Sequence, residues 1–129
     1  MGVTKDGKLV AARAKLMHEA GAFPGSPVGS AAQSMFTPYD IENIYIETYS
    51  IVDNKPSTAA YRAPGAPSGS YSAEAIVDEL CEQLDMDPLE FRLKNAAKKG
   101  TRRVSGLVNP VIGCVETTEA TKAHGHWNT

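Results

Sequence analysis

The segment DMDPLEFRLKNAAKKG constrains the fold most, because it marks both ends of a helix. Asp87 is a favoured N-cap residue, Pro88 suits the first helical position, and Glu90 stands three residues after the cap. Gly100 can adopt the left-handed backbone that ends a helix, and two lysines precede it. The pattern predicts a helix that closes near Gly100. Its inward-facing residues are expected to be Leu89, Leu93, Ala96 and Ala97.

A second helix should begin near Tyr71, directly behind the loop AYRAPGAPSG. Ser70 or Ser72 could cap it, and Glu74 would lie in the first turn, where the helix dipole favours an anion. Apolar residues then recur at helical spacing, which predicts one buried face. That face would carry Ile76, Val77, Leu80, Cys81 and Leu84.

Two segments have the alternating pattern of β-strands. Apolar residues occupy every second position from Val10 to Leu16, after a turn signal at Asp6-Gly7 whose partner strand would lie in residues 1–5. The segment IENIYIETYSIV alternates more clearly and is rich in β-branched and aromatic residues. We expect Ile44 and Ile46 on one face, and Tyr45 and Tyr49 on the other.

These elements predict an α+β fold, with a small antiparallel sheet and two or three helices packed on one side. A short helix is expected over 31–35 and a last helix over 115–123. The 129 residues suffice for one modest domain. A net charge of −2 gives no reason to expect nucleic acid or an anionic membrane as partner, and the first residues lack a signal-peptide core, so we expect a cytoplasmic protein.

The loop AYRAPGAPSG is the strongest candidate for a binding site. Pro64 restricts the backbone, whereas Gly65 permits angles that other residues avoid. Arg62 supplies a planar guanidinium for oxyanions or carboxylates beside a helix start. From composition alone, however, the favoured interpretation is a connecting loop whose arginine makes a surface ion pair.

Three motifs in order carry a family resemblance: AYRAPGAPSG, then the helix segment EAIVDEL, then MDPLEFRLKN. Together they resemble the molybdenum-binding subunit of the xanthine dehydrogenase and aldehyde oxidase family, and VETTEATKAHGHW is similar to the stretch that follows there. The resemblance runs from about Pro38 to Trp127. It implies that residues 1–129 form part of a larger molybdenum-cofactor-binding domain.

The resemblance also implies roles for the loop. By position, Arg62, Ala63 and Gly65 would lie against the molybdenum–molybdopterin cofactor, and Pro64 would shape the substrate pocket. The family hydroxylates carbon with oxygen from water, and electrons leave through iron–sulfur clusters and FAD on other domains or subunits. Those FAD-binding and iron–sulfur units, and a small-molecule substrate, are the implied partners.

Departures from the family pattern narrow the activity. The carbon monoxide dehydrogenases of the family carry cysteine where this chain has Ala63, and purine-oxidising members carry phenylalanine at the position of Pro64. Both activities are disfavoured, which leaves an aldehyde or an N-heterocyclic or other aromatic substrate. Ser68 replaces the usual glutamine of the loop, so the contacts of that glutamine would be absent.

The Gly-rich segment around the family's catalytic glutamate does not occur in these 129 residues. We therefore expect no catalytic residue here, no cofactor bound to the chain alone, and no turnover without the rest of the parent enzyme. Two alternatives stay open. One is a stand-alone, non-catalytic binding or interaction module on the same scaffold, and the other is an anion-binding domain that uses the arginine loop.

Overall fold

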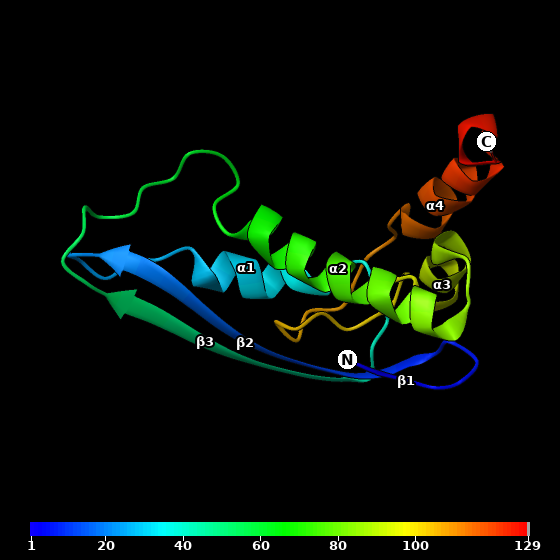
Figure 1. Ribbon diagram of the computed structural model, residues 1–129, viewed down its shortest axis with the longest axis horizontal. Helices are drawn as coiled ribbons and strands as arrows, with labels where there is room; N and C mark the ends of the chain where they lie inside the picture. The colour runs from blue at the N-terminus through cyan, green and yellow to red at the C-terminus, as the bar shows by residue number, and fades with distance from the viewer. Residues whose placement is uncertain (129) are drawn as a thin grey trace.

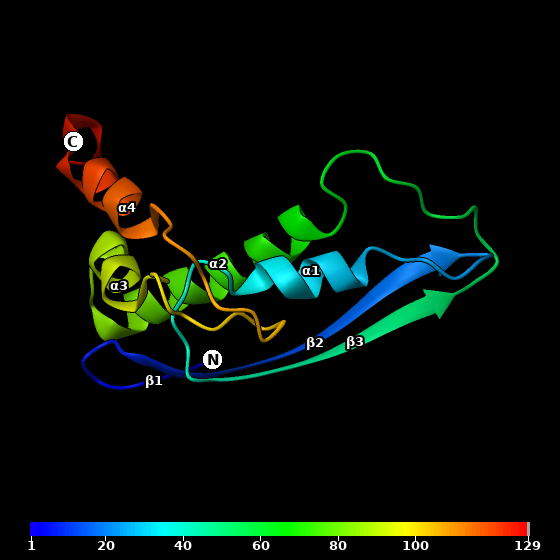
Figure 2. The same ribbon diagram turned by 180° about the vertical axis from the view of Figure 1, so that it is seen from behind.

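The computed structural model describes residues 1–128 as a three-stranded sheet with helices on one face, which confirms the predicted α+β class (Figure 1, Figure 2). Along the chain the elements are β1 (Gly2–Val3), β2 (Leu9–Gly21), α1 (Val28–Met35), β3 (Asn43–Val52), α2 (Ala66–Leu84), α3 (Pro88–Asn95), α4 (Cys114–Ala123) and the 3₁₀ helix η1 (Gly125–Asn128). Within residues 1–128, the apolar stretches of the helices are too short to cross a membrane.

The sheet has the order β1-β2-β3 and is mixed rather than wholly antiparallel. β1 and β2 form the expected antiparallel pair, and the turn between them is closed by a 2.9 Å bond from the Gly7 N–H to the Thr4 carbonyl. β2 and β3, however, run parallel. Here the prediction of an antiparallel sheet was wrong, because α1 lies in the connection and carries the chain back before β3 begins. Alternation in sequence identifies the faces of a strand but not its direction.

The expected faces of β3 are confirmed. Ile44 and Ile46 pack against the hydrophobic core, whereas Tyr45 and Tyr49 are exposed on the opposite face. The helices lie over the inner face only (Figure 2). The core beneath them is formed by Leu9, Ala12, Met35, Phe36, Tyr39, Ile41, Ala73, Val77, Cys81 and Phe91.

Helix α2 begins at Ala66, about one turn earlier than predicted, so neither Ser70 nor Ser72 caps it. The cap is Gly65, and the proline behind it lies in the first turn, where a missing N–H costs nothing. The earlier start moves Glu74 into the interior of the helix, and Ile76 is 40% exposed instead of facing inward. The buried positions of α2 are Gly69, Ala73, Val77 and Cys81, with Leu80 and Leu84 partly buried beside them.

Helix α3 begins as predicted: the Asp87 carboxylate accepts bonds from the Leu89 and Glu90 N–H groups at 2.9 and 2.8 Å. It ends at Asn95, earlier than the predicted exit at Gly100. Ala96 is extended and bridges to Tyr39, and both Ala96 and the following Ala97 are buried there. A tertiary contact, rather than local signals, ends this helix.

Candidate functional site

The arginine loop, residues 53–65, connects β3 to α2. It is the long irregular segment at one end of the molecule in Figure 1. Its base is fixed to the end of β2. The Ala22 N–H donates to the Lys55 carbonyl at 2.9 Å, and the Thr58 N–H donates to the Ala20 carbonyl at 3.0 Å. Gly21 has a φ of 76°, and a Cβ there would lie 2.2 Å from the Pro56 carbonyl oxygen. Only glycine fits where the loop crosses the strand.

The other end of the loop is fixed against α1. Gly65 has a φ of 85°, and a Cβ there would lie 2.2 Å from the Pro27 carbonyl oxygen. Gly69, in the first turns of α2, is similarly close to the Ala31 carbonyl oxygen, at 2.5 Å. The loop is therefore held at both ends by close backbone contacts, at Gly21 and at Gly65, although its middle is exposed.

The predicted site residues lie together on the exposed part of this loop. Arg62, Ala63 and Pro64 are exposed and Gly65 is half-buried. Ala63 has a φ of 46°, an uncommon left-handed conformation for a residue with a side chain. Pro64 lines a hollow of about 130 Å³ under the loop. The other lining residues are Gly25, Pro27, Thr58, Ala59 and Ala60.

The loop has hydrogen-bond donors without acceptors. Among residues 1–128, the Arg62 guanidinium makes no hydrogen bond or ion pair. The backbone N–H groups of residues 59–63 likewise find no acceptor within that range. A cluster of free donors beside a hollow suits an anionic or oxygen-rich group.

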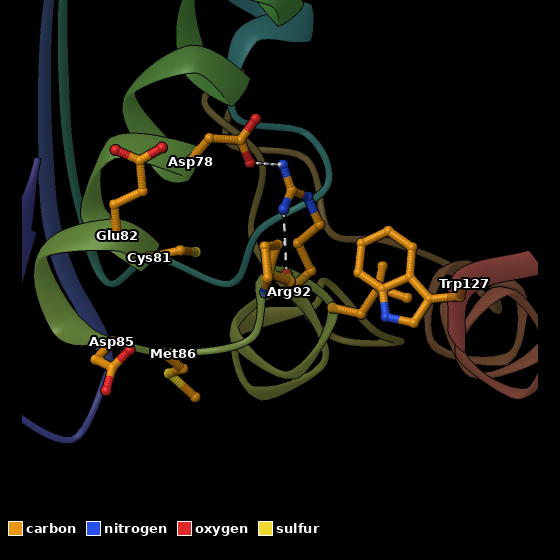
Figure 3. A pocket seen from close by; sticks show the side chains of 9 residues that line it. Asp78, Cys81, Glu82, Asp85, Met86, Arg92 and Trp127 are labelled. Atoms are coloured by element: carbon orange, nitrogen blue, oxygen red, sulfur yellow. Dashed lines mark hydrogen bonds and ion pairs between the residues drawn. The ribbon is translucent and has the colours of Figure 1, made fainter. Parts of the chain in front are cut away.

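A second cluster, which the sequence did not predict, lies between α2 and α3 (Figure 3). Arg92 donates to Glu74 at 2.7 Å and to Asp78 at 2.8 Å, and the Tyr39 hydroxyl donates to Glu74 at 2.7 Å. Burial is the main cause that raises the pKa of Tyr39 well above its usual value, and the bond to Glu74 raises it further. Burial opposes the charge of Arg92, but its bonds to Asp78 and Glu74 outweigh that effect and raise its pKa.

A pocket of about 660 Å³ opens beside this cluster. Asp78 and Arg92 line it and point toward each other, and Trp127 lies across from them (Figure 3). Because the guanidinium is already bound by two carboxylates and by the Pro88 carbonyl, its donors are used within the fold. The cluster therefore fastens α3 to α2.

A third connection pins the β1–β2 turn to α3. Asn95 is fully buried; it accepts from the Leu9 N–H at 2.8 Å and donates to the Gly7 carbonyl at 2.8 Å. The neighbouring Lys94 donates to the Asp6 carboxylate at 2.8 Å, and this bond lowers the pKa of Asp6 to about 2. These residues fall within the resemblance motif MDPLEFRLKN, and they hold the fold together.

Comparison with known proteins confirms the resemblance. The family model described as "Molybdopterin cofactor-binding domain" matches residues 1–96, so the chain belongs to that family. The nicotinate dehydrogenase large molybdopterin subunit of Eubacterium barkeri is 30% identical over 122 residues, which cover 92% of this chain and 29% of that protein. The aldehyde oxidoreductase of Megalodesulfovibrio gigas is 35% identical over 107 residues, 79% of this chain and 12% of that protein.

Solved structures agree with this assignment. The aldehyde oxidoreductase from Desulfovibrio desulfuricans ATCC 27774 superposes with a TM-score of 0.85 at 26% identity, over 96% of this chain and 14% of that one. The enzyme from Desulfovibrio gigas gives a TM-score of 0.82 at 27% identity, over 93% of this chain and 14% of that one. The chain thus spans less than a third of the length of each of these relatives.

Proposed function

We propose that residues 1–129 form one wall of the molybdenum–molybdopterin site of a larger oxidoreductase. The single observation that carries this proposal is the arginine loop, in which the Arg62 guanidinium and the backbone N–H groups of residues 59–63 have no acceptor among residues 1–128 and lie next to a hollow. Pyranopterin cofactors carry phosphate and ring oxygen and nitrogen atoms, which are the acceptors such donors fit. Family membership supports the same assignment.

Arg62 would donate to acceptor atoms of the cofactor. Ala63 and Gly65 would contribute backbone at its edge, because their left-handed conformations turn the chain sharply there. Pro64 would line the substrate side. The cofactor, when bound, supplies the redox chemistry of carbon hydroxylation, and the chain's part is to bind and orient.

The substrate is proposed to be an aldehyde or an N-heterocyclic or other aromatic compound. The small side chain of Ala63 and the non-aromatic ring of Pro64 leave room at the loop but offer no face for stacking on a purine. The names of two relatives, a nicotinate dehydrogenase and an aldehyde oxidoreductase, fall in these two substrate classes.

The 129-residue chain alone is proposed to be inactive. Its relatives are several times longer. Residues on one side of a site cannot by themselves position both the cofactor and the substrate. FAD-binding and iron–sulfur domains or subunits are proposed as electron-transfer partners, and a cytoplasmic location remains a prediction.

Replacing Arg62 with alanine in the complete enzyme tests the proposal. We expect sharply lower turnover and weaker cofactor retention, with a stability change under about 1 kcal/mol because the side chain is exposed. The matched control is Arg102→Ala, which removes another exposed arginine; in the part of the chain that the structure describes, its guanidinium donates only to the Gly106 carbonyl. Wild-type turnover and cofactor content in Arg62→Ala would refute the proposed role.

A further inference from the structure

Strand β3 forms one edge of the sheet along its whole length. It pairs with β2 on one side from Asn43 to Val52, and no strand of residues 1–128 lies on its other side. Outside the β2 ladder, its backbone makes no hydrogen bond to any residue in that range. Ten residues of edge therefore present unpaired backbone groups.

This edge lacks the features that usually protect an exposed strand. Edge strands are commonly short, interrupted by proline, bent by a bulge or charged with lysine. β3 contains no proline and no lysine, and its register with β2 is regular from Asn43 to Ile51. Its one charged residue, Glu47, is held at 2.8 Å by Arg13 of β2. An isolated edge of this kind is a template for a further strand.

The side chains of β3 point to the same conclusion. Four large apolar residues of the strand are more than a third exposed, and their relative exposures are 58, 42, 38 and 53% for Tyr45, Tyr49, Ile51 and Val52. Segments with high β-propensity, little charge and no proline associate readily when they are left uncovered. Together with the unpaired backbone groups, this composition makes the edge of β3 a favourable place for an added strand.

We infer that the outer edge of β3 is the docking site for an extended segment of the same molybdenum subunit, from outside residues 1–129, which adds a fourth strand. The inference rests on the proposed function, since it requires the chain to be part of a larger subunit. Related chains supply the reason for choosing this occupant. Their matching region superposes on 96% of this chain but makes up only 14% of a much longer polypeptide.

The backbone direction of β3 identifies which amides the added strand would use. The Asp53 N–H, just after β3, points to β2 and donates to the Gly21 carbonyl at 3.1 Å. Backbone groups of successive residues in an extended strand alternate in direction. The N–H groups of Ile46, Thr48 and Ser50 are therefore expected to point outward, away from β2.

Hydrogen–deuterium exchange resolved to single amides tests this inference. In the 129-residue chain alone, we expect the amides of Ile46, Thr48 and Ser50 to exchange fast while Tyr45 and Glu47 are protected. In the complete subunit, the three outward amides should exchange at least about tenfold more slowly. Fast exchange of these three amides in the complete subunit would overturn the inference. Protection that already appears in the chain alone and grows with its concentration would do so too, because a second copy would then be the occupant.

A pair of substitutions at one position provides an independent test. Thr48→Pro removes an outward N–H, whereas Thr48→Val keeps it and preserves the strand preference. In the complete subunit, Thr48→Pro should lower the melting temperature and remove the protection of Ile46 and Ser50, and Thr48→Val should change neither. Equal behaviour of the two variants would contradict the inference. Pterin content, measured on the same samples, separates this result from the proposed function: protected amides in a subunit without pterin would leave the inference standing and the function refuted.

Discussion

Asn95 joins the turn between β1 and β2 to helix α3 through three backbone groups, and replacing it with alanine measures what that junction contributes. The side chain is completely buried. Its amide accepts from the Leu9 N–H at 2.8 Å and donates to the carbonyls of Gly7 and Phe91 at 2.8 and 2.9 Å. Asn95→Ala removes all three bonds.

The magnitude follows from the groups left behind. The Leu9 N–H and the Gly7 carbonyl lose the side-chain partner that the structure gives them, and each unsatisfied buried group costs about 1–3 kcal/mol. The Phe91 carbonyl lies within α3, where helix N–H groups remain available, so we do not count it. The free energy of unfolding should fall by about 2–6 kcal/mol, which is a decrease in melting temperature of roughly 8–24 °C for a chain of this size.

Urea unfolding followed by circular dichroism is the appropriate assay. The control is Asn43→Ala, which removes an exposed amide with one bond of 3.3 Å to the Val10 carbonyl and should change stability by less than about 0.5 kcal/mol. A loss below about 1 kcal/mol in Asn95→Ala would refute the reasoning, since the junction would then contribute no more than an ordinary hydrogen bond.

Two further predictions concern packing and pH. Gly69→Ala should destabilise the chain by about 1–3 kcal/mol in thermal unfolding, because the new Cβ would meet the Ala31 carbonyl oxygen at 2.5 Å. Gly29→Ala in α1 is the control: the space around Gly29 is open, so this variant should stabilise the chain by up to about 1 kcal/mol. If both variants behaved alike, the close approach of α1 and α2 would be wrong. The pKa of Asp6 is lowered from 3.8 to about 2 by its bond to Lys94, so its contribution to stability is present above pH 3.8 and is lost as the pH falls toward 2. The stability difference between wild type and Lys94→Met should therefore shrink over that interval, and a constant difference would contradict the ion pair.

Local signals predicted much of the fold. The turn at Gly7, the alternating faces of β3 and the capped start of α3 at Asp87 all depend on neighbouring residues, and the structure confirms them. The parallel pairing of β2 with β3 was missed because it depends on the path of the chain between them. The early end of α3 was missed for a similar reason, since Ala96 is drawn into a bridge with the distant Tyr39.

The candidate site was predicted only in part. The loop was identified from its arginine, prolines and glycines, but the reason for Gly65, its close approach to Pro27, appears only in three dimensions. The Glu74–Arg92–Tyr39 cluster was missed because its members are 18 and 35 residues apart. The one usable signal was the charge pattern: Glu74 and Asp78 are one helical turn apart and together can hold an arginine.

Metal and pterin analysis tests the central claim most directly. The claim is that the arginine loop forms one wall of a molybdopterin site whose remaining walls lie in other parts of a larger subunit. We predict no molybdenum or pterin in the purified 129-residue chain, stoichiometric amounts of both in the complete subunit, and a large loss of both from that subunit when Arg62 is replaced with alanine. Full occupancy in the isolated chain, or undiminished occupancy in the Arg62→Ala subunit, would contradict the account.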